Sequence, residues 1–175
     1  AEVFFNKNAD LNLAPFFLPY LSGERTPHND PYLRGSFHMI NTSTSLGSLI
    51  YSVIEGISFG IKDGFNAVNS INENSKTIYL VGGGSKSKFW GDLIATILNK
   101  EIVIGEDSEF GPALGVARLG MLATKKYNIN EVIKNIKIIR ECRPKNQFSN
   151  ILEKRYKKWE TIVNINKSIS KKIIE

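Results

Sequence analysis

The chain has 175 residues, 42% of them hydrophobic and 10% aromatic, which indicates one folded domain and excludes a disordered protein. Its single cysteine excludes a disulfide framework and a cysteine-based zinc site, and it fits a cytoplasmic environment. No apolar run approaches the ~20 residues of a membrane span. Most of the net charge of +6 lies in residues 151–175, which contain seven Lys or Arg and three Glu. We therefore expect a solvated basic helix there, and we expect neither nucleic acid nor a membrane as a partner.

Residues 15–36 are rich in turn formers, and the four prolines between Pro15 and Pro31 exclude a helix there. Long structured loops in compact domains tend to be functional. This segment is therefore a candidate for a role in a binding site.

The next segment, residues 46–69, repeats apolar residues at three- and four-residue intervals, which predicts a helix of some six turns. Gly56, Gly60 and Gly64 recur every fourth residue along it. Each glycine costs helix stability, so we expect this face to press closely on a neighbouring element in the core.

Three consecutive glycines at 82–84 form the most informative motif. A β-rich run at 78–81 precedes them, a helical pattern begins near Ser85–Ser87, and a second apolar run follows at 102–104. A strand, glycine turn, helix and strand in this order bring backbone close to a nucleotide and direct a helix N-terminus toward it.

The residues alone leave several interpretations of this turn open. A Walker A loop fails because Ser85 stands where its glycine is required before Lys86-Ser87. A Rossmann fingerprint matches in part, with Asp107 at the position of the ribose-binding acid, but such a domain normally opens with this unit. Two further interpretations remain. The turn could bind adenosine, as in actin-like and sugar-kinase ATPases, or it could be a glycine-rich connection without a ligand.

Beyond this unit the sequence predicts only helices. Residues 111–123 carry Pro112 in a first-turn position and many small residues, which suggests another tightly packed helix. Helical patterns follow at about 130–140 and 147–165, and the last ten residues are expected to fray.

The remaining chemically active side chains are expected to be structural. His28 and His38, the latter in a predicted strand, have no partner with metal-ligand spacing. We expect Glu55 and Asp63, on the long helix, to be hydrogen-bonded structural carboxylates and not a catalytic pair. Cys142 has no evident base to activate its thiol, so we expect it to be inert. We therefore expect no metal site.

Four blocks in order and at matching spacing carry a family resemblance. They are FLPYLSGERTPHNDPYLRGSF (17–37), VIEG with Asp63-Gly64 on the long helix, VGGGSKSKFW (81–90) and GPALGVARLGMLA (111–123). Together they resemble the C-terminal part of the FGGY carbohydrate kinases, most of all the xylulokinases, over residues 15–162. The resemblance implies a partial actin-like, ribonuclease-H-like α/β domain over 1–165, with a mixed sheet flanked by helices, and a basic tail at 166–175.

The same resemblance implies ATP-dependent phosphorylation of a sugar hydroxyl, most of all that of D-xylulose to D-xylulose 5-phosphate. The phosphate loop, the sugar pocket, the general-base aspartate and the Mg²⁺ ligands would lie in an N-terminal lobe outside these residues, so no catalytic residue is assigned and the fragment alone would be inactive. It also allows a homodimer. Alternatives are an FGGY kinase for ribulose, gluconate, glycerol or a related polyol, a non-catalytic nucleotide-binding module, and a Rossmann dehydrogenase.

Carried over position by position, Gly83 and Gly84 match glycines that pass close to adenine and ribose, and Gly82 completes the turn. Ser85 and Ser87 match positions beside the nucleotide, while Lys86 is expected to be solvated.

In the proline loop, Glu24 and Arg25 match the family's GERTP segment. We expect them to hold that loop against the cleft by an ion pair or backbone hydrogen bonds, with direct substrate contact as the alternative.

Overall fold

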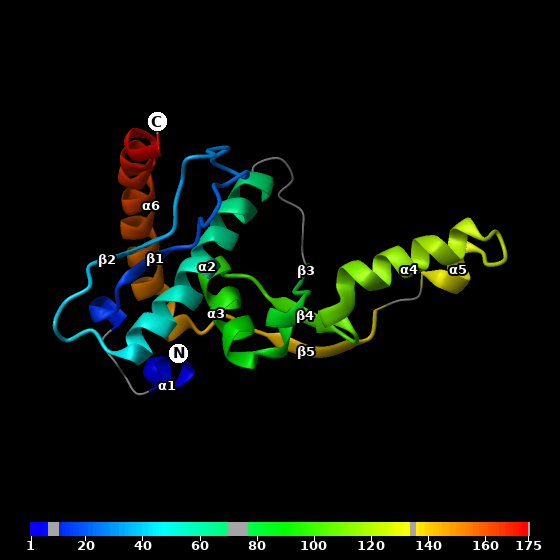
Figure 1. Cartoon of the computed structure of the whole chain (residues 1–175). Helices are drawn as coiled ribbons and strands as arrows, with labels where there is room; N and C mark the ends of the chain where they lie inside the picture. The colour runs from blue at the N-terminus through cyan, green and yellow to red at the C-terminus, as the bar shows by residue number, and fades with distance from the viewer. Residues whose placement is uncertain (7–10, 70–76, 134–135, 175) are drawn as a thin grey trace.

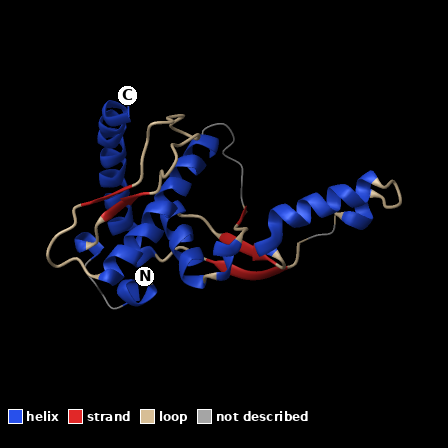
Figure 2. Ribbon diagram, viewed as in Figure 1, coloured by secondary structure: helices blue, strands red, loops and turns tan. Residues whose placement is uncertain are grey.

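A computed structural model describes residues 1–6, 11–69, 77–133 and 136–174. It is an α/β structure in which helices pack around two small sheets (Figures 1 and 2). Its helices and strands are α1 (Glu2–Asn6), β1 (Phe16–Leu18), β2 (Ser36–His38), α2 (Leu46–Asn69), β3 (Ile78–Tyr79), α3 (Lys88–Leu98), β4 (Ile102–Gly105), α4 (Gly111–Ala123), α5 (Ile129–Val132), β5 (Ile138–Cys142) and α6 (Asn146–Ile174).

The two sheets differ in composition. Strands β1 and β2 form an antiparallel pair with Phe17 opposite Phe37. In the second sheet β4 lies between β3, which is parallel to it, and β5, which is antiparallel. The predicted mixed sheet is therefore confirmed, as is the strand at His38.

Helix α2 matches its predicted bounds, and its glycine stripe has a partial explanation. A Cβ on Gly56 would lie 2.2 Å from the carbonyl oxygen of Phe17, so strand β1 approaches the helix too closely for any side chain. A Cβ on Gly60 would only touch Pro19, and one on Gly64 would meet nothing within 4 Å. The predicted close contact is confirmed at Gly56 and is wrong at Gly64.

The main core lies where α1, α2, α3, α6 and β1 meet. Trp159 of α6 and Tyr51 and Phe59 of α2 are completely buried in it. The indole Nε1 of Trp159 donates to the carbonyl of Phe17 at 2.9 Å, so this large ring is buried with its one polar group satisfied. This core fixes α6 against β1 and α2.

A buried ion pair joins the two long helices. Arg155 of α6 donates to both carboxylate oxygens of Glu55, from Nε at 2.7 Å and from Nη2 at 2.6 Å. It also donates to the carbonyls of Leu11, at 2.6 Å, and Ala14, at 3.2 Å. Both side chains are 1% exposed, so the prediction that Glu55 is a structural carboxylate is confirmed.

The C-terminal third differs from the sequence prediction. The expected helix over 130–140 is wrong: α5 is a single turn that ends at Val132, and Ile138–Cys142 forms strand β5 along β4. Helix α6 covers the expected 147–165 but continues to Ile174, with Asn166 and Ser170 buried, so the expected fraying is wrong for 166–174.

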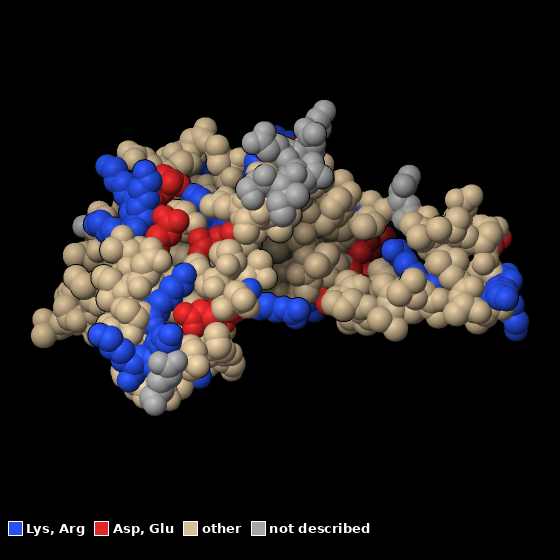
Figure 3. All heavy atoms as spheres, turned by 90° about the horizontal axis from the view of Figure 1, so that it is seen from above, with Lys and Arg blue, Asp and Glu red and all other residues tan. Residues whose placement is uncertain are grey.

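Helices α4 and α5 form an arm that projects from the rest of the molecule (Figure 1). No residue of α4 is buried, and Val116 and Leu119 are 70% and 67% exposed. The predicted tight packing of this helix is therefore wrong within the described residues. Seen from above, the arm is largely uncharged along its length (Figure 3).

Candidate functional site

The glycine turn connects β3 to α3, and the loop after β4 holds it in place. Gly82 adopts φ +92°, a conformation that favours glycine, and its N–H donates to the carbonyl of Ser108 at 2.8 Å. Residues Gly83–Lys86 then form one 3₁₀ turn before α3 begins at Lys88. The sequence therefore predicted the strand, turn and helix correctly.

The three glycines serve different purposes. A Cβ on Gly84 would lie 2.5 Å from the ring of Trp90, whose indole N–H in turn donates to Ser58 of α2 at 2.9 Å. A Cβ on Gly82 or Gly83 would meet nothing within 4 Å. Gly84 thus allows the turn to pack against α3 and α2, while Gly82 and Gly83 leave an open side where a ligand can approach the backbone.

Both predicted serines use their hydroxyl groups within the protein. Ser85 is buried, and its Oγ lies 3.0 Å from the Oγ of Ser108. Ser87 caps α3 by accepting a hydrogen bond from the N–H of Trp90 at 3.2 Å. These contacts shape the turn and position the first turn of α3, whose partial positive charge favours an anion.

The two basic residues at the turn are both engaged. The guanidinium of Arg140, on β5, donates to the carbonyl of Ser85 and, at 3.4 Å, to that of Lys86. The ammonium of Lys86 pairs with Glu109 at 2.9 Å, although its side chain is 65% exposed. This agrees with the prediction of a solvated lysine and makes Arg140 a support of the turn from β5.

Asp92, one turn further along α3, is an ionised carboxylate held by two lysines. Its Oδ2 lies 2.8 Å from Lys88 Nζ and 3.3 Å from Lys145 Nζ. Burial alone would raise the pKa of Asp92, but the hydrogen bonds and charges of the two lysines outweigh it and hold that pKa below the ordinary value. The pKa of Cys142 is raised by its burial first and by Asp92 second, which keeps this thiol protonated, as its predicted inertness requires.

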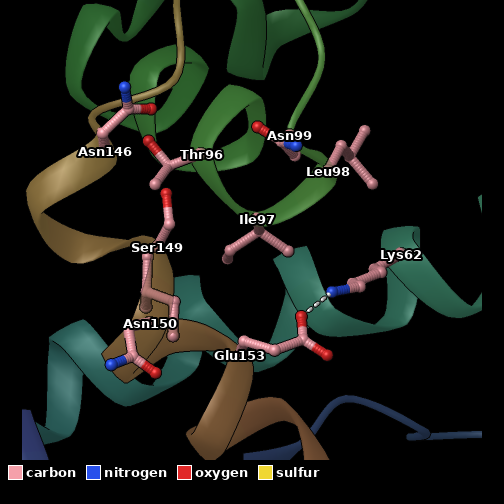
Figure 4. Close-up of a pocket in the computed structure, with 10 residues that line it drawn as sticks. Lys62, Thr96, Ile97, Leu98, Asn99, Asn146, Ser149, Asn150 and Glu153 are labelled. Atoms are coloured by element: carbon pink, nitrogen blue, oxygen red, sulfur yellow. Dashed lines mark hydrogen bonds and ion pairs between the residues drawn. The ribbon is translucent and has the colours of Figure 1, made fainter.

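Two of the hollows in the described part of the chain have volumes near 500 Å³, and the three glycines line neither of them. One, of about 500 Å³, lies between the sheet and α4, with Val81, Ser108 and Arg118 in its lining. The other, of about 460 Å³, lies at the C-terminal end of α3, where Asn99 is part of the lining and Lys62 of α2 pairs with Glu153 of α6 at 2.6 Å (Figure 4).

The proline loop lies elsewhere in the molecule, beside α6 and the end of α2 (Figure 1). Glu24 accepts the backbone N–H groups of Thr26 at 2.6 Å and His28 at 2.8 Å, so these hydrogen bonds lie within the loop, and the expected role in holding it against the cleft stays a prediction. Arg25 is exposed. The structure does not bring Glu24 and Arg25 together with the glycine turn.

Some supporting residues were not predicted from the sequence. Arg155 stands three residues after Leu152 and four before Trp159, in the middle of an apolar stripe, and this position was the available signal for a buried cation. Ser108 and Arg140 had no such signal, because they reach the turn only through the pairing of the sheet.

Neither a metal site nor a membrane-spanning helix is found in the described part of the chain. No group of three or more His, Cys, Asp or Glu there is arranged to hold a metal ion. None of the helices in that part combines the length and apolar character needed to cross a membrane.

A family model described as the FGGY family of carbohydrate kinases, C-terminal domain, matches residues 2–124. The chain is 36% identical over 118 residues to a xylulose kinase of Escherichia coli, covering 67% of this chain and 24% of that protein. It is 31% identical over 121 residues to a gluconokinase of Bacillus subtilis, covering 69% and 23%. The chain thus spans about a quarter of the length of these curated relatives.

Solved structures of carbohydrate kinases also match this chain. The crystal structure of a xyloylose kinase from Brucella ovis matches with a TM-score of 0.77 at 33% identity, covering 89% of this chain and 32% of that one. Plasmodium falciparum glycerol kinase with ADP matches with a TM-score of 0.70 at 18% identity, covering 94% and 33%, and so supports the fold alone. The predicted actin-like fold is confirmed.

Proposed function

Because the chain belongs to the FGGY family of carbohydrate kinases, we propose that it is the adenosine-binding part of an ATP-dependent sugar kinase. The observation that carries the proposal is the open side of Gly82 and Gly83, beside the capped N-terminus of α3. Backbone without side chains admits a flat base and ribose at short distance, and the helix N-terminus favours the phosphates that follow. Ser85, Ser87 and Gly84 then act by holding this surface in shape.

In the phosphoryl transfer that we propose, a sugar hydroxyl attacks the γ-phosphorus of ATP and ADP leaves. Such a reaction depends on positioning and on charge stabilisation, with Mg²⁺ offsetting the charge of the phosphates when it is bound. Glu55 is paired with Arg155 and Asp92 with two lysines, and no group of three or more His, Cys, Asp or Glu among the described residues is arranged to hold a metal ion. We therefore assign the catalytic base and the Mg²⁺ ligands to residues outside this chain, and we expect the chain alone to bind nucleotide without turnover.

For the sugar we propose D-xylulose, because xylulose kinases are prominent among the relatives. Gluconate is the second candidate, since a gluconokinase is also similar to the chain. The kinase that contains this domain should be assayed with both sugars. Higher kcat/KM for gluconate than for D-xylulose would overturn the first assignment and leave the nucleotide assignment intact.

The nucleotide site can be tested with Gly83→Val, which introduces a side chain into open space on the proposed binding surface. ATP binding, measured by isothermal titration calorimetry, should weaken at least tenfold. Gly120→Val is the matched control, because a Cβ there also meets nothing within 4 Å but lies on the arm. Equal ATP affinity of Gly83→Val and the parent chain would refute the proposal.

A further inference from the structure

His28 is a junction between the proline loop and two helices. Its Nε2 lies 3.1 Å from Oδ2 of Asp63, on α2, and 3.2 Å from the hydroxyl of Tyr20. Its Nδ1 lies 2.9 Å from Nζ of Lys167, on α6. The side chains of His28 and Asp63 are only 13% and 10% exposed. Three segments far apart in the sequence therefore meet on one imidazole ring.

These partners determine which nitrogen carries the proton. The Lys167 ammonium can only donate, so Nδ1 must offer its lone pair, and the proton of the neutral ring lies on Nε2 and points to Asp63. Burial, followed by the charge of Asp63, raises the pKa of Tyr20 far above the ordinary value, so this phenol stays neutral. The result is a hydrogen-bond relay that runs from Lys167 through His28 to Asp63.

The relay continues beyond Asp63 and has further charges near it. Asp63 also accepts the hydroxyl of Tyr156, on α6. Glu160 of α6 lines the small hollow beside His28, and the carboxylate of Glu24 accepts the His28 backbone N–H. These carboxylates and Asp63 are the negative groups around the ring, and Lys167 is the positive group that a proton on Nδ1 would face.

Backbone contacts hold the two sides of the proline loop together next to His28. Gly23 donates to the carbonyl of Leu33 at 3.1 Å, and Glu24 and Asp30 exchange two backbone hydrogen bonds at 2.8 and 2.9 Å. A Cβ on Gly23 would lie 2.9 Å from Pro31, so the two sides of the loop are in direct contact. These contacts join the two sides of the loop on either side of His28.

We propose that His28 is a pH-sensitive latch that ties the proline loop to the C-terminal third of α6 through Lys167. With one proton on the ring, His28 accepts from Lys167 at Nδ1 and donates to Asp63 from Nε2. With a second proton on Nδ1, the ring faces the Lys167 ammonium at hydrogen-bond distance and displaces it, while Asp63 remains paired with the imidazolium. Acidification thus removes the tie between His28 and α6, whereas the hydrogen bond from Asn166 of α6 to Ser36 and the attachment of the loop to α2 remain.

Amide hydrogen exchange of the 175-residue chain, followed by NMR at pH 8 and pH 5 and corrected for intrinsic exchange, tests the latch. The equilibrium constant for opening, measured at the amides of residues 163–174, should be about tenfold larger at pH 5 than at pH 8, as expected for the loss of one hydrogen bond to a charged group. Amides in the middle of α2 should not change. Nitrogen-15 shifts of the ring at pH 8 should show an unprotonated Nδ1 on His28.

Two variants make the test specific. Lys167→Met removes the ammonium and should abolish the pH dependence of exchange in 163–174. Lys172→Met is the matched control, because Lys172 is an exposed lysine in the same segment of α6 and its loss should leave that dependence intact. A protonated Nδ1 on His28 at pH 8, or unchanged pH dependence in Lys167→Met, would overturn the proposal.

Discussion

Replacing Arg155 by leucine would leave the Glu55 carboxylate buried without its cation. Removing one partner of a buried ion pair typically costs ~3–5 kcal/mol, because the other charge stays uncompensated. The carbonyl of Ala14 would also lose its Arg155 donors, and that of Leu11 would keep only the Ala14 N–H, so the upper part of this range is expected. Domains of this kind have unfolding free energies of ~5–15 kcal/mol, so the variant should lose about a third of its stability or more.

Urea unfolding followed by far-UV circular dichroism measures this loss, with Trp159 fluorescence as a second probe in the same core. The double variant Glu55→Leu/Arg155→Leu should be more stable than Arg155→Leu, because it removes the orphaned charge. Arg143→Leu, an exposed arginine paired with Glu101, is the control and should not shift the midpoint. A loss below about 1 kcal/mol for Arg155→Leu, or a double variant that is no more stable, would refute the reasoning.

Two further predictions concern α2 and α3. Gly56→Ala should destabilise the chain by about 1–3 kcal/mol, because its Cβ would overlap the Phe17 carbonyl. Gly64→Ala should stabilise it by about 0.5–1 kcal/mol, because its Cβ would meet nothing within 4 Å and alanine favours a helix. Equal melting temperatures of the two variants would contradict this prediction. The pKa of Asp92 is lowered in the folded chain, so the ionised carboxylate stabilises the fold. This contribution to the free energy of unfolding is fully present above the pKa of an unfolded carboxylate and is lost as the pH falls through the folded-state pKa. Asp92→Asn should therefore lower the urea midpoint at pH 7 more than at pH 3, and an equal loss at both values would exclude this linkage.

Local patterns were sufficient to predict the elements whose partners lie close in sequence. The α2 period and the strand–turn–helix unit around the three glycines were predicted because apolar spacing and the demands of the turn act locally. The same kind of pattern misled at 130–140, where it predicts a helix. Helix α5 ends at Val132, and Ile138–Cys142 pairs with β4 as strand β5.

The candidate site was predictable in its backbone but not in its supports. Gly82 and Gly83 stand open as a nucleotide surface requires, yet the hydroxyl of Ser85 is directed to Ser108, 23 residues away. Arg140 reaches the turn across the sheet, from 55 residues away. Contacts of this kind depend on the register of β4 and β5, which no single segment encodes.

The arm formed by α4 and α5 has a practical consequence. Val116, Leu119 and Ile133 expose hydrocarbon to water while the chain is folded, so an environment-sensitive dye will bind the native state as well as the unfolded one. Dye fluorescence will then begin high and report poorly on melting. Heat capacity, circular dichroism or the intrinsic fluorescence of the tryptophans are the signals with which unfolding of this chain should be followed.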